Sequence, residues 1–157
     1  MALRLLTIDE VKAKLGTEYP ELTDGVLEML AQEAEVFVYK HTDTYPQAQG
    51  EGEDITYVFY CDQGTLDVMQ VAARWKALAN CVAKILNIEG SNIEFKLAEL
   101  SVSKEPATQA LLKLYYMAEH QCDKYLGLIS EGPKRIRGAT VILPASANST
   151  DWIYSAV

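Results

Sequence analysis

The chain has 157 residues, of which 49% are apolar and 23% charged, a composition typical of one globular domain. Its three cysteines are an odd number and form no CxxC pair, which argues against a disulfide scaffold and against a zinc module. No apolar run approaches the roughly 20 residues that span a bilayer, and the N-terminal stretch reaches Asp9 and Glu10 too soon for a signal peptide. We therefore do not expect a secreted, transmembrane or disulfide-rich protein.

The net charge of −8 is concentrated in the first part of the chain. Residues 1–60 hold four Lys/Arg and twelve Asp/Glu, whereas residues 61–157 hold ten of each. An acidic surface disfavours binding to a phosphate backbone, because affinity for nucleic acid depends on clustered cations. The acidic region either serves solubility, or it faces a basic partner or repels nucleic acid that passes nearby.

Two helices are predicted before residue 43. Thr7 and Glu10 have the spacing of a capping box, and Gly16 is a typical helix stop. After a turn around Pro20, a second helix is expected from residue 23 or 24 to between residues 40 and 42. Its apolar residues recur at helical spacing: Leu27, Leu30, Ala34, Phe37 and Val38.

A polar loop and a strand should follow. Residues 42–54 carry one proline, two glycines and four acids, the composition of an exposed loop. Residues 55–61, ITYVFYC, are β-branched and aromatic and predict a strand. Because an exposed strand of this kind would aggregate, we expect this chain or a neighbouring subunit to cover it.

Two further helices are predicted in the second half of the chain. The third should cover about residues 65–88 and be closed by Gly90, and its alanines would allow another helix to approach closely. Residues 92–104 have short strand-like character. The fourth helix should begin at Pro106, which a first helical turn tolerates, and end at Gly127.

The tail, residues 128–157, differs in composition from the helices. It is punctuated by glycine, proline and serine and carries a basic group that includes Arg135 and Arg137. Residues 139–143 favour a strand, and the last residues, WIYSAV, are apolar and aromatic. This pattern suits either strand addition to the sheet edge of a partner or docking onto the helices of the same chain.

The sequence offers no pattern of catalytic or metal-binding residues. The two histidines, His41 and His120, have no partner at ligand spacing. The acidic loop lacks both the GxxxxGK[ST] phosphate motif and the spacing of a calcium loop. Carboxylate neighbours such as Glu33 and Glu35 point apart on a helix. We therefore expect no enzyme, no cofactor and no metal.

The cysteines fit the same expectation. Cys81 and Cys122 lie on apolar helix faces and are expected to be small core residues. Cys61 ends the predicted strand and could be exposed, but no histidine lies close to it in sequence that would activate the thiol.

Nine tyrosines point to a protein interface, where tyrosine is enriched for its rigid ring and its hydroxyl. Four lie in segments that are expected to be exposed: Tyr45, Tyr57, Tyr60 and Tyr154. Three others are expected to pack in the core: Tyr115, Tyr116 and Tyr125.

The order of these segments resembles the head–tail connector (adaptor) proteins of tailed phages. The opening LLTIDEVKAKLG is similar to the capped first helix of that family, and TDGVLEMLAQEAEVFVYKHT is similar to its second helix. The segments AARWKALANCVAKIL and ELSVSKEPATQALLKLYYMAEHQC are similar to its third and fourth helices with their extended link. The resemblance covers roughly residues 3–126.

Together with the helix pattern, the resemblance implies an all-α, four-helix domain at residues 1–127, with an acidic insert at 42–61 and an extended C-terminal arm at 128–157. It implies a non-enzymatic virion protein of the head–tail junction, assembled in the host cytoplasm as a ring, commonly of twelve subunits. This ring would bind the portal protein and the next neck or tail protein, and DNA would pass through it without specific binding. The candidate partner-binding residues lie in the insert and the arm: Tyr45, Tyr57, Arg135, Arg137, Val141, Leu143, Trp152 and Tyr154.

The sequence departs from this family in three places, and alternatives remain. Gly16 replaces a short polar run, the insert is longer and more acidic, and the C-terminal extension exceeds the minimal domain. The chain could instead be another neck or tail-completion protein, or a small cytoplasmic helical regulatory module. A peptidoglycan-cleaving accessory would need a convergent acid such as Glu10 or Glu28.

Overall fold

Helices form most of the computed structural model, which describes residues 5–16, 19–50, 56–88, 93–131, 139–143 and 153–156. The helices are α1 (Ile8–Leu15), α2 (Asp24–Thr42), α3 (Gln63–Ile85), α4 (Ile93–Ser101) and α5 (Pro106–Glu131). The strands are β1 (Gln47–Gln49), β2 (Thr56–Phe59), β3 (Ala139–Leu143) and β4 (Ile153–Ala156). The prediction of a mainly helical protein is confirmed. The described residues form five helices rather than the predicted four. They also form a small sheet, so the protein is not purely α-helical.

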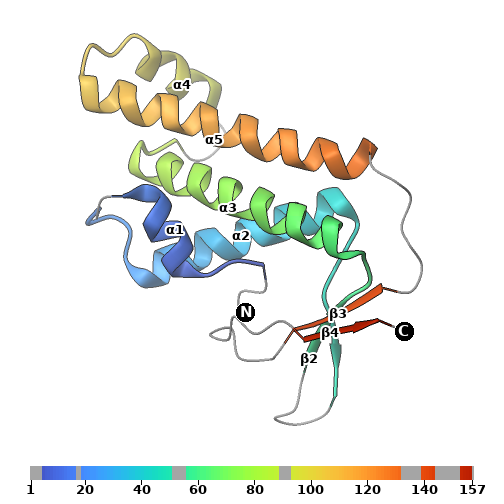
Figure 1. The fold of residues 1–157 in the computed structure, drawn as a ribbon. Helices are drawn as coiled ribbons and strands as arrows, with labels where there is room; N and C mark the ends of the chain where they lie inside the picture. The colour runs from blue at the N-terminus through green and yellow to red at the C-terminus, as the bar shows by residue number, and fades with distance from the viewer. Residues whose placement is uncertain are drawn as a thin grey trace.

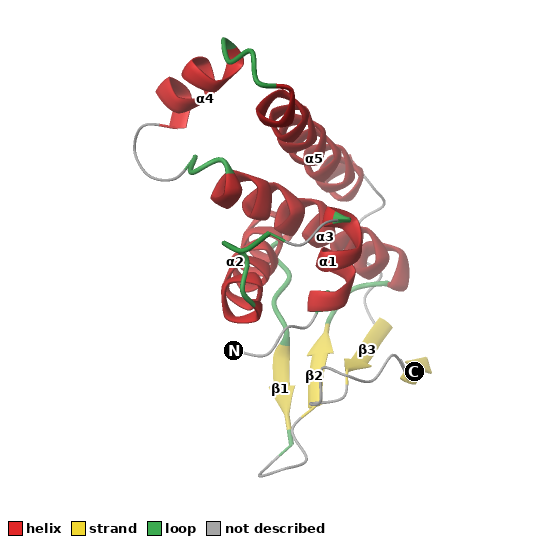
Figure 2. Cartoon of the chain, turned by 90° about the vertical axis from the view of Figure 1, so that its left-hand side faces the viewer, coloured by secondary structure: helices red, strands yellow, loops and turns green. Residues whose placement is uncertain are grey.

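The third helix, α3, lies at the centre of the helical body (Figure 1). α5 packs along one side of α3, and α1 and α2 pack on the other, an order that Figures 1 and 2 both show. Fully buried alanines on α3 permit the predicted close approach of its neighbours: Ala72, Ala73, Ala77 and Ala79. A larger apolar cluster joins α1, α2, α3 and Phe59, and a smaller one joins Leu78 and Val82 of α3 to Ala118 of α5.

The first two helices begin and end where the sequence predicts. The Thr7 hydroxyl accepts a hydrogen bond from the Glu10 amide (3.3 Å), and the Glu10 carboxylate accepts one from the Thr7 amide (2.9 Å). Gly16 adopts the left-handed conformation, with φ of 69°, that glycine favours at a helix end. Thr23 precedes the first residue of α2, and the helix ends at Thr42.

The ends of α3 differ slightly from the prediction. The helix begins at Gln63 because the Asp62 carboxylate caps it and accepts a hydrogen bond from the Thr65 amide (2.9 Å). It ends at Ile85, and Asn87 follows with a left-handed φ of 54°. Gly90, the predicted stop, lies outside the described residues.

The predicted strand-like character of residues 92–104 is wrong, because this segment forms α4. The short helix packs against α5. Gln109 of α5 closes the end of α4: its side-chain amide donates to the carbonyl oxygens of Leu100 (3.0 Å) and Ser103 (2.7 Å). The Leu100 carbonyl also accepts a hydrogen bond from the Ser103 amide (3.1 Å), so the Gln109 side chain joins the turn after α4 to α5.

The last helix begins at Pro106 as predicted but continues past Gly127 to Glu131. Ile129, beyond the predicted stop, packs against the larger apolar cluster. Burial of this side chain explains why the helix extends through a residue that often ends helices.

The four strands form one antiparallel sheet in the order β1-β2-β3-β4, below α3 in Figure 1. The predicted strand at 55–61 is confirmed as β2, and Val58 and Phe59 are fully buried, so this strand is covered as expected. β1 lies inside the segment predicted as a loop. The predicted strand at 139–143 is confirmed as β3. It pairs with β2 of the same chain, whereas one of the two alternatives from sequence was docking of the tail onto the helices.

Candidate partner-binding surface

An exposed strand at the edge of the sheet is the clearest candidate for partner binding. β1 stands at one end of the strand order and pairs with β2 (Figure 2), and its three residues are all exposed. Tyr45 and Tyr60 lie beside it with 49% and 51% of their surface exposed, and the Gln49 side chain donates to the Tyr60 hydroxyl (2.8 Å). We call Tyr45, residues 47–49 and Tyr60 the edge surface. An edge strand with exposed aromatic rings can accept another strand or a flat protein surface.

Aromatic contacts attach the edge surface to the core. The rings of Tyr45 and Tyr39 lie with centroids 6.1 Å apart, and those of Tyr39 and Phe59 lie 5.9 Å apart. Tyr39 and Phe59 are buried. The exposed Tyr45 ring is thus positioned by buried aromatic residues, which favours a preformed contact surface.

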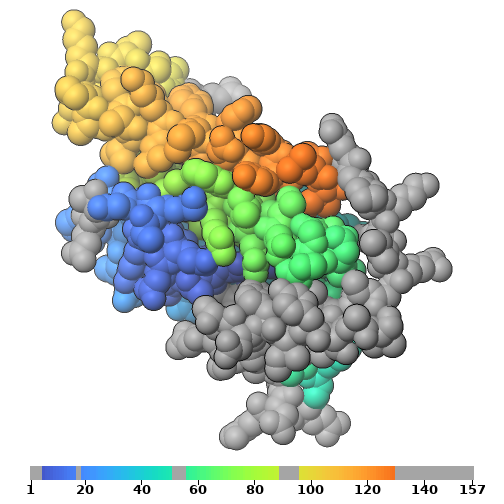
Figure 3. Space-filling view, in the orientation of Figure 1, coloured from blue at the N-terminus to red at the C-terminus, as the bar shows by residue number. Residues whose placement is uncertain are grey.

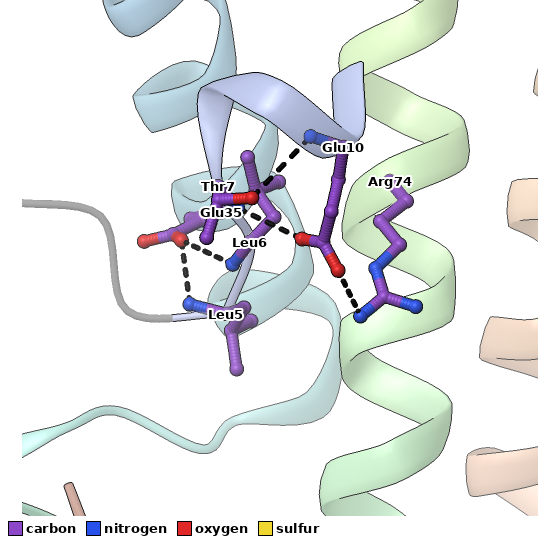
Figure 4. Close-up of polar contacts among 6 residues, drawn as sticks. All are labelled: Leu5, Leu6, Thr7, Glu10, Glu35 and Arg74. Carbon is purple, nitrogen blue, oxygen red and sulfur yellow. Dashed lines mark hydrogen bonds and ion pairs between the residues drawn. The ribbon is translucent and has the colours of Figure 1, made fainter. Parts of the chain in front are cut away.

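The buried carboxylate of Glu35 holds the N-terminal segment against α2 (Figure 4). Only 3% of Glu35 is exposed, and one of its oxygens accepts hydrogen bonds from the amides of Leu5 (2.6 Å) and Leu6 (3.2 Å). Its other oxygen accepts one from the Tyr39 hydroxyl (3.0 Å). Sequence analysis missed this role. The signal was present, since Glu35 falls on the apolar stripe of α2, between Ala31 and Tyr39 at intervals of four.

The acids considered for peptidoglycan cleavage have other contacts. Glu10 caps α1, and its second oxygen forms an ion pair with Arg74 of α3 at 2.6 Å (Figure 4). Glu28 is exposed on α2 and accepts a hydrogen bond from Gln32 one turn later (3.3 Å). Both acids therefore make contacts that stabilise helices. No described contact orients either of them toward a substrate.

The structure brings several of the predicted partner-binding residues together in the sheet. Tyr57 is paired with Leu143, Phe59 with Val141, and Val141 with Tyr154. Tyr45 is exposed as predicted, whereas Tyr57 is half-buried and packs against the core. Three further candidates lie outside the described residues: Arg135, Arg137 and Trp152.

All three cysteines are buried. Cys81 and Cys122 lie in the larger apolar cluster, so the prediction that they are core residues is confirmed, and burial raises the pKa of each to about 12. Cys61, which the sequence allowed to be exposed, is buried: 4% of it is exposed, because it lies in the apolar cluster that contains Phe59.

The two histidines do not belong to a group of metal-binding side chains among the described residues. His41 lies on α2 with Nδ1 3.0 Å from the Phe37 carbonyl oxygen and its ring against the Phe37 ring, and His120 is exposed on α5. Across the part of the chain that the structure describes, no three His, Cys, Asp or Glu residues are grouped to hold a metal ion. Among the same residues, no helix has both the length and the apolar character needed to cross a membrane.

Another tyrosine prediction is only partly right. Tyr125 packs against the larger cluster and Tyr115 against the smaller one. Tyr116, which was also expected in the core, is 50% exposed because it lies on the side of α5 that faces away from α3.

Comparison of the chain with protein-family models, with curated proteins and with solved structures finds no match. What the chain does must therefore be inferred from its own sequence and geometry.

Proposed function

We propose that this chain is a structural protein of a tailed-phage virion: a head–tail connector subunit that binds the portal protein and the next neck protein. Several copies would form a ring that extends the DNA channel. In this proposal the chain acts through surfaces that contact other proteins and performs no chemistry.

The edge surface is the observation that carries the proposal. It combines an exposed edge strand with two half-exposed tyrosine rings, one of them positioned by buried aromatic residues. Tyrosine supplies much of the binding energy at many protein interfaces. A surface of this kind fits a protein partner better than a small molecule, which usually binds in a concave pocket.

The helix order supports the choice of partner class. The segments that resemble the connector family coincide with α1, α2, α3 and α5. The C-terminal arm of that family reaches the portal, and here the corresponding residues include β3 and β4, which continue the same sheet as the edge surface. One continuous sheet could therefore present both parts of a portal contact.

Binding to a portal ring tests the proposal directly. The purified chain is mixed with candidate portal proteins, and the mass of each complex is measured by light scattering after size-exclusion chromatography. We expect several copies of the chain on each portal ring. A chain that binds none of the portals from phages with a related neck gene order would contradict the proposal and favour a small helical regulatory module.

Point variants test the role of the edge surface. Tyr45→Ala and Tyr60→Ala should each weaken portal binding tenfold or more, about 1.4 kcal/mol, the loss typical of an important interface tyrosine. Val102→Ser is the control, because Val102 is 77% exposed but lies next to α4, at the far end of the helical body from the sheet (Figure 1). Equal binding by all three variants would remove the edge surface from the proposal.

A further inference from the structure

The buried side chain of Tyr39 joins two parts of the molecule that lie far apart in the sequence. Its hydroxyl donates to one oxygen of the Glu35 carboxylate (3.0 Å). The other oxygen of that carboxylate accepts hydrogen bonds from the amides of Leu5 and Leu6. The Tyr39 ring lies 6.1 Å from the ring of Tyr45, which belongs to the edge surface. Tyr39 therefore contacts both the group that holds the N-terminal segment and a candidate partner-binding residue.

The backbone of Tyr39 fixes the chain that leads to Tyr45. The Tyr39 carbonyl oxygen accepts hydrogen bonds from the amides of Asp43 and Thr44, the second at 3.3 Å. Asp43 ends α2 with a left-handed φ of 48°, and Thr44 is buried. Tyr45 is the next residue in the chain. The position of its ring thus depends on the backbone of Tyr39 as well as on its side chain.

The N-terminal segment, residues 5–7, can open without unfolding a helix. Leu5 and Leu6 are buried, although the segment belongs to no helix or strand. Glu35 holds the amides of these two residues, whereas Thr7 is fixed separately in the capping box of α1 (Figure 4). Opening of a short segment of this kind costs less than unfolding of the helices around it. Opening about Thr7 would withdraw both amides from Glu35 while α1 stays folded.

We infer that the N-terminal segment is a latch that controls the edge surface. When it is docked, the Glu35 carboxylate holds the Tyr39 hydroxyl, and Tyr45 keeps the position in which a partner binds it. When it opens, the buried carboxylate loses two of these three hydrogen bonds and turns toward water, which releases Tyr39. Because such coupling is reciprocal, a partner bound at the edge surface holds the segment docked. The inference rests on the proposed function only for the identity of the partner.

Hydrogen exchange in the free chain tests the coupling. Tyr45→Ala removes the ring that rests on Tyr39 and should speed exchange at the Leu5 and Leu6 amides about threefold or more, the size of effect expected for an aromatic pair. Rates are compared with those of amides in α3, which removes any change in global stability. Tyr39→Phe keeps the ring but removes the hydroxyl that transmits the effect, so Tyr45→Ala added to that variant should have little further effect.

Two equally exposed tyrosines provide matched controls. Tyr60 belongs to the edge surface, and its hydroxyl accepts a hydrogen bond from Gln49. Tyr116 lies on α5, which forms the upper surface in Figure 3, and its ring lies 5.6 Å from the Tyr115 ring. Neither Tyr60→Ala nor Tyr116→Ala should change exchange in the N-terminal segment. Circular dichroism checks that every variant is helical.

Three results in the free chain would each overturn the inference. The first is exchange at Leu5 and Leu6 that Tyr45→Ala leaves unchanged. The second is a response of the same size to either control substitution. The third is an undiminished response to Tyr45→Ala in the Tyr39→Phe variant, because the hydroxyl would then transmit nothing.

Portal binding, measured in parallel, separates this inference from the proposed function. Bound portal should slow exchange at Leu5 and Leu6, and Tyr39→Phe should weaken portal binding, each about threefold or more, although the Tyr39 hydroxyl is buried. Coupled exchange in a chain that binds no portal would support the latch and contradict the connector role. Uncoupled exchange in a chain whose portal binding Tyr39→Phe leaves unchanged would overturn the latch and leave the connector role standing.

Discussion

Replacing Glu35 with leucine should destabilise the fold more than any surface substitution. The carboxylate is buried and accepts three hydrogen bonds, from the amides of Leu5 and Leu6 and from the Tyr39 hydroxyl. Leucine has a similar volume but accepts none of them. The change therefore leaves two amides and one hydroxyl without their acceptor in a site that excludes water.

The expected loss follows from these three contacts. A buried donor left without its acceptor costs about 1–3 kcal/mol, and part of this cost is recovered if the N-terminal segment opens and the amides of Leu5 and Leu6 meet water. We therefore expect the free energy of unfolding to fall by about 3–5 kcal/mol in Glu35→Leu. Tyr39→Phe removes one hydrogen bond and leaves the carboxylate its two amide donors, so it should cost about 1–2 kcal/mol.

Urea denaturation of Glu35→Leu, Tyr39→Phe and Glu33→Gln measures these differences. Glu33 is the matched control, since it is an exposed glutamate on the same helix, and its replacement should change the free energy of unfolding by less than about 0.5 kcal/mol. Hydrogen exchange at the amides of Leu5 and Leu6 reports the segment itself and should speed up selectively in Glu35→Leu. A loss below 1 kcal/mol with unchanged exchange at these amides would refute the assigned role.

Two further predictions concern groups whose pKa the fold shifts. Hydrogen bonds from Thr65, its side chain first and then its backbone, lower the pKa of Asp62 from 3.8. Stability that depends on the Asp62 charge is therefore complete above that value and is lost as pH falls through the lower folded-state pKa. Asp62→Ala should cost about 1 kcal/mol near pH 7, and the advantage of Asp62 over asparagine should vanish in acid, as urea denaturation from pH 7 to pH 2 would reveal. The thiols of Cys81 and Cys122, whose pKa values burial raises to about 12, should resist iodoacetamide at pH 8 until denaturant unfolds the chain, and rapid modification of the folded protein, seen by mass spectrometry, would contradict their burial.

Local signals predicted the helices well. The Thr7 and Glu10 capping box and the left-handed Gly16 depend on neighbours within a few residues, so the sequence contains all the information that fixes α1. By contrast, α4 has a mixed pattern: Ile93, Phe95 and Leu97 alternate like a strand before Leu100 follows at helical spacing. Contact with α5 and the Gln109 side chain, eight or more residues away, decide the outcome.

Contacts distant in sequence were the part that could not be predicted. The pairing of Tyr57 with Leu143 joins positions more than eighty residues apart, and no local rule fixes such a register. Two of the three groups that donate to Glu35, the amides of Leu5 and Leu6, lie about thirty positions away in an N-terminal segment without regular structure. An acid within an apolar stripe can be recognised as unusual from sequence, and Tyr39 one turn later is a local donor, but the two amides that complete its set of donors become visible only in three dimensions.

The acidic first part of the chain divides into two groups with different physical roles. Glu10 and Glu35 are committed to the fold, one through its cap and Arg74 and the other through buried hydrogen bonds. Glu28 and Glu33 remain exposed on different sides of α2, and Glu28 accepts a hydrogen bond from Gln32 one turn later. If the exposed pair served solubility alone, moving its charge to another surface would leave assembly unchanged. Measuring the solubility and self-association of a Glu28→Gln, Glu33→Gln variant separates the two roles, because lower solubility with unchanged association assigns the exposed pair to solubility.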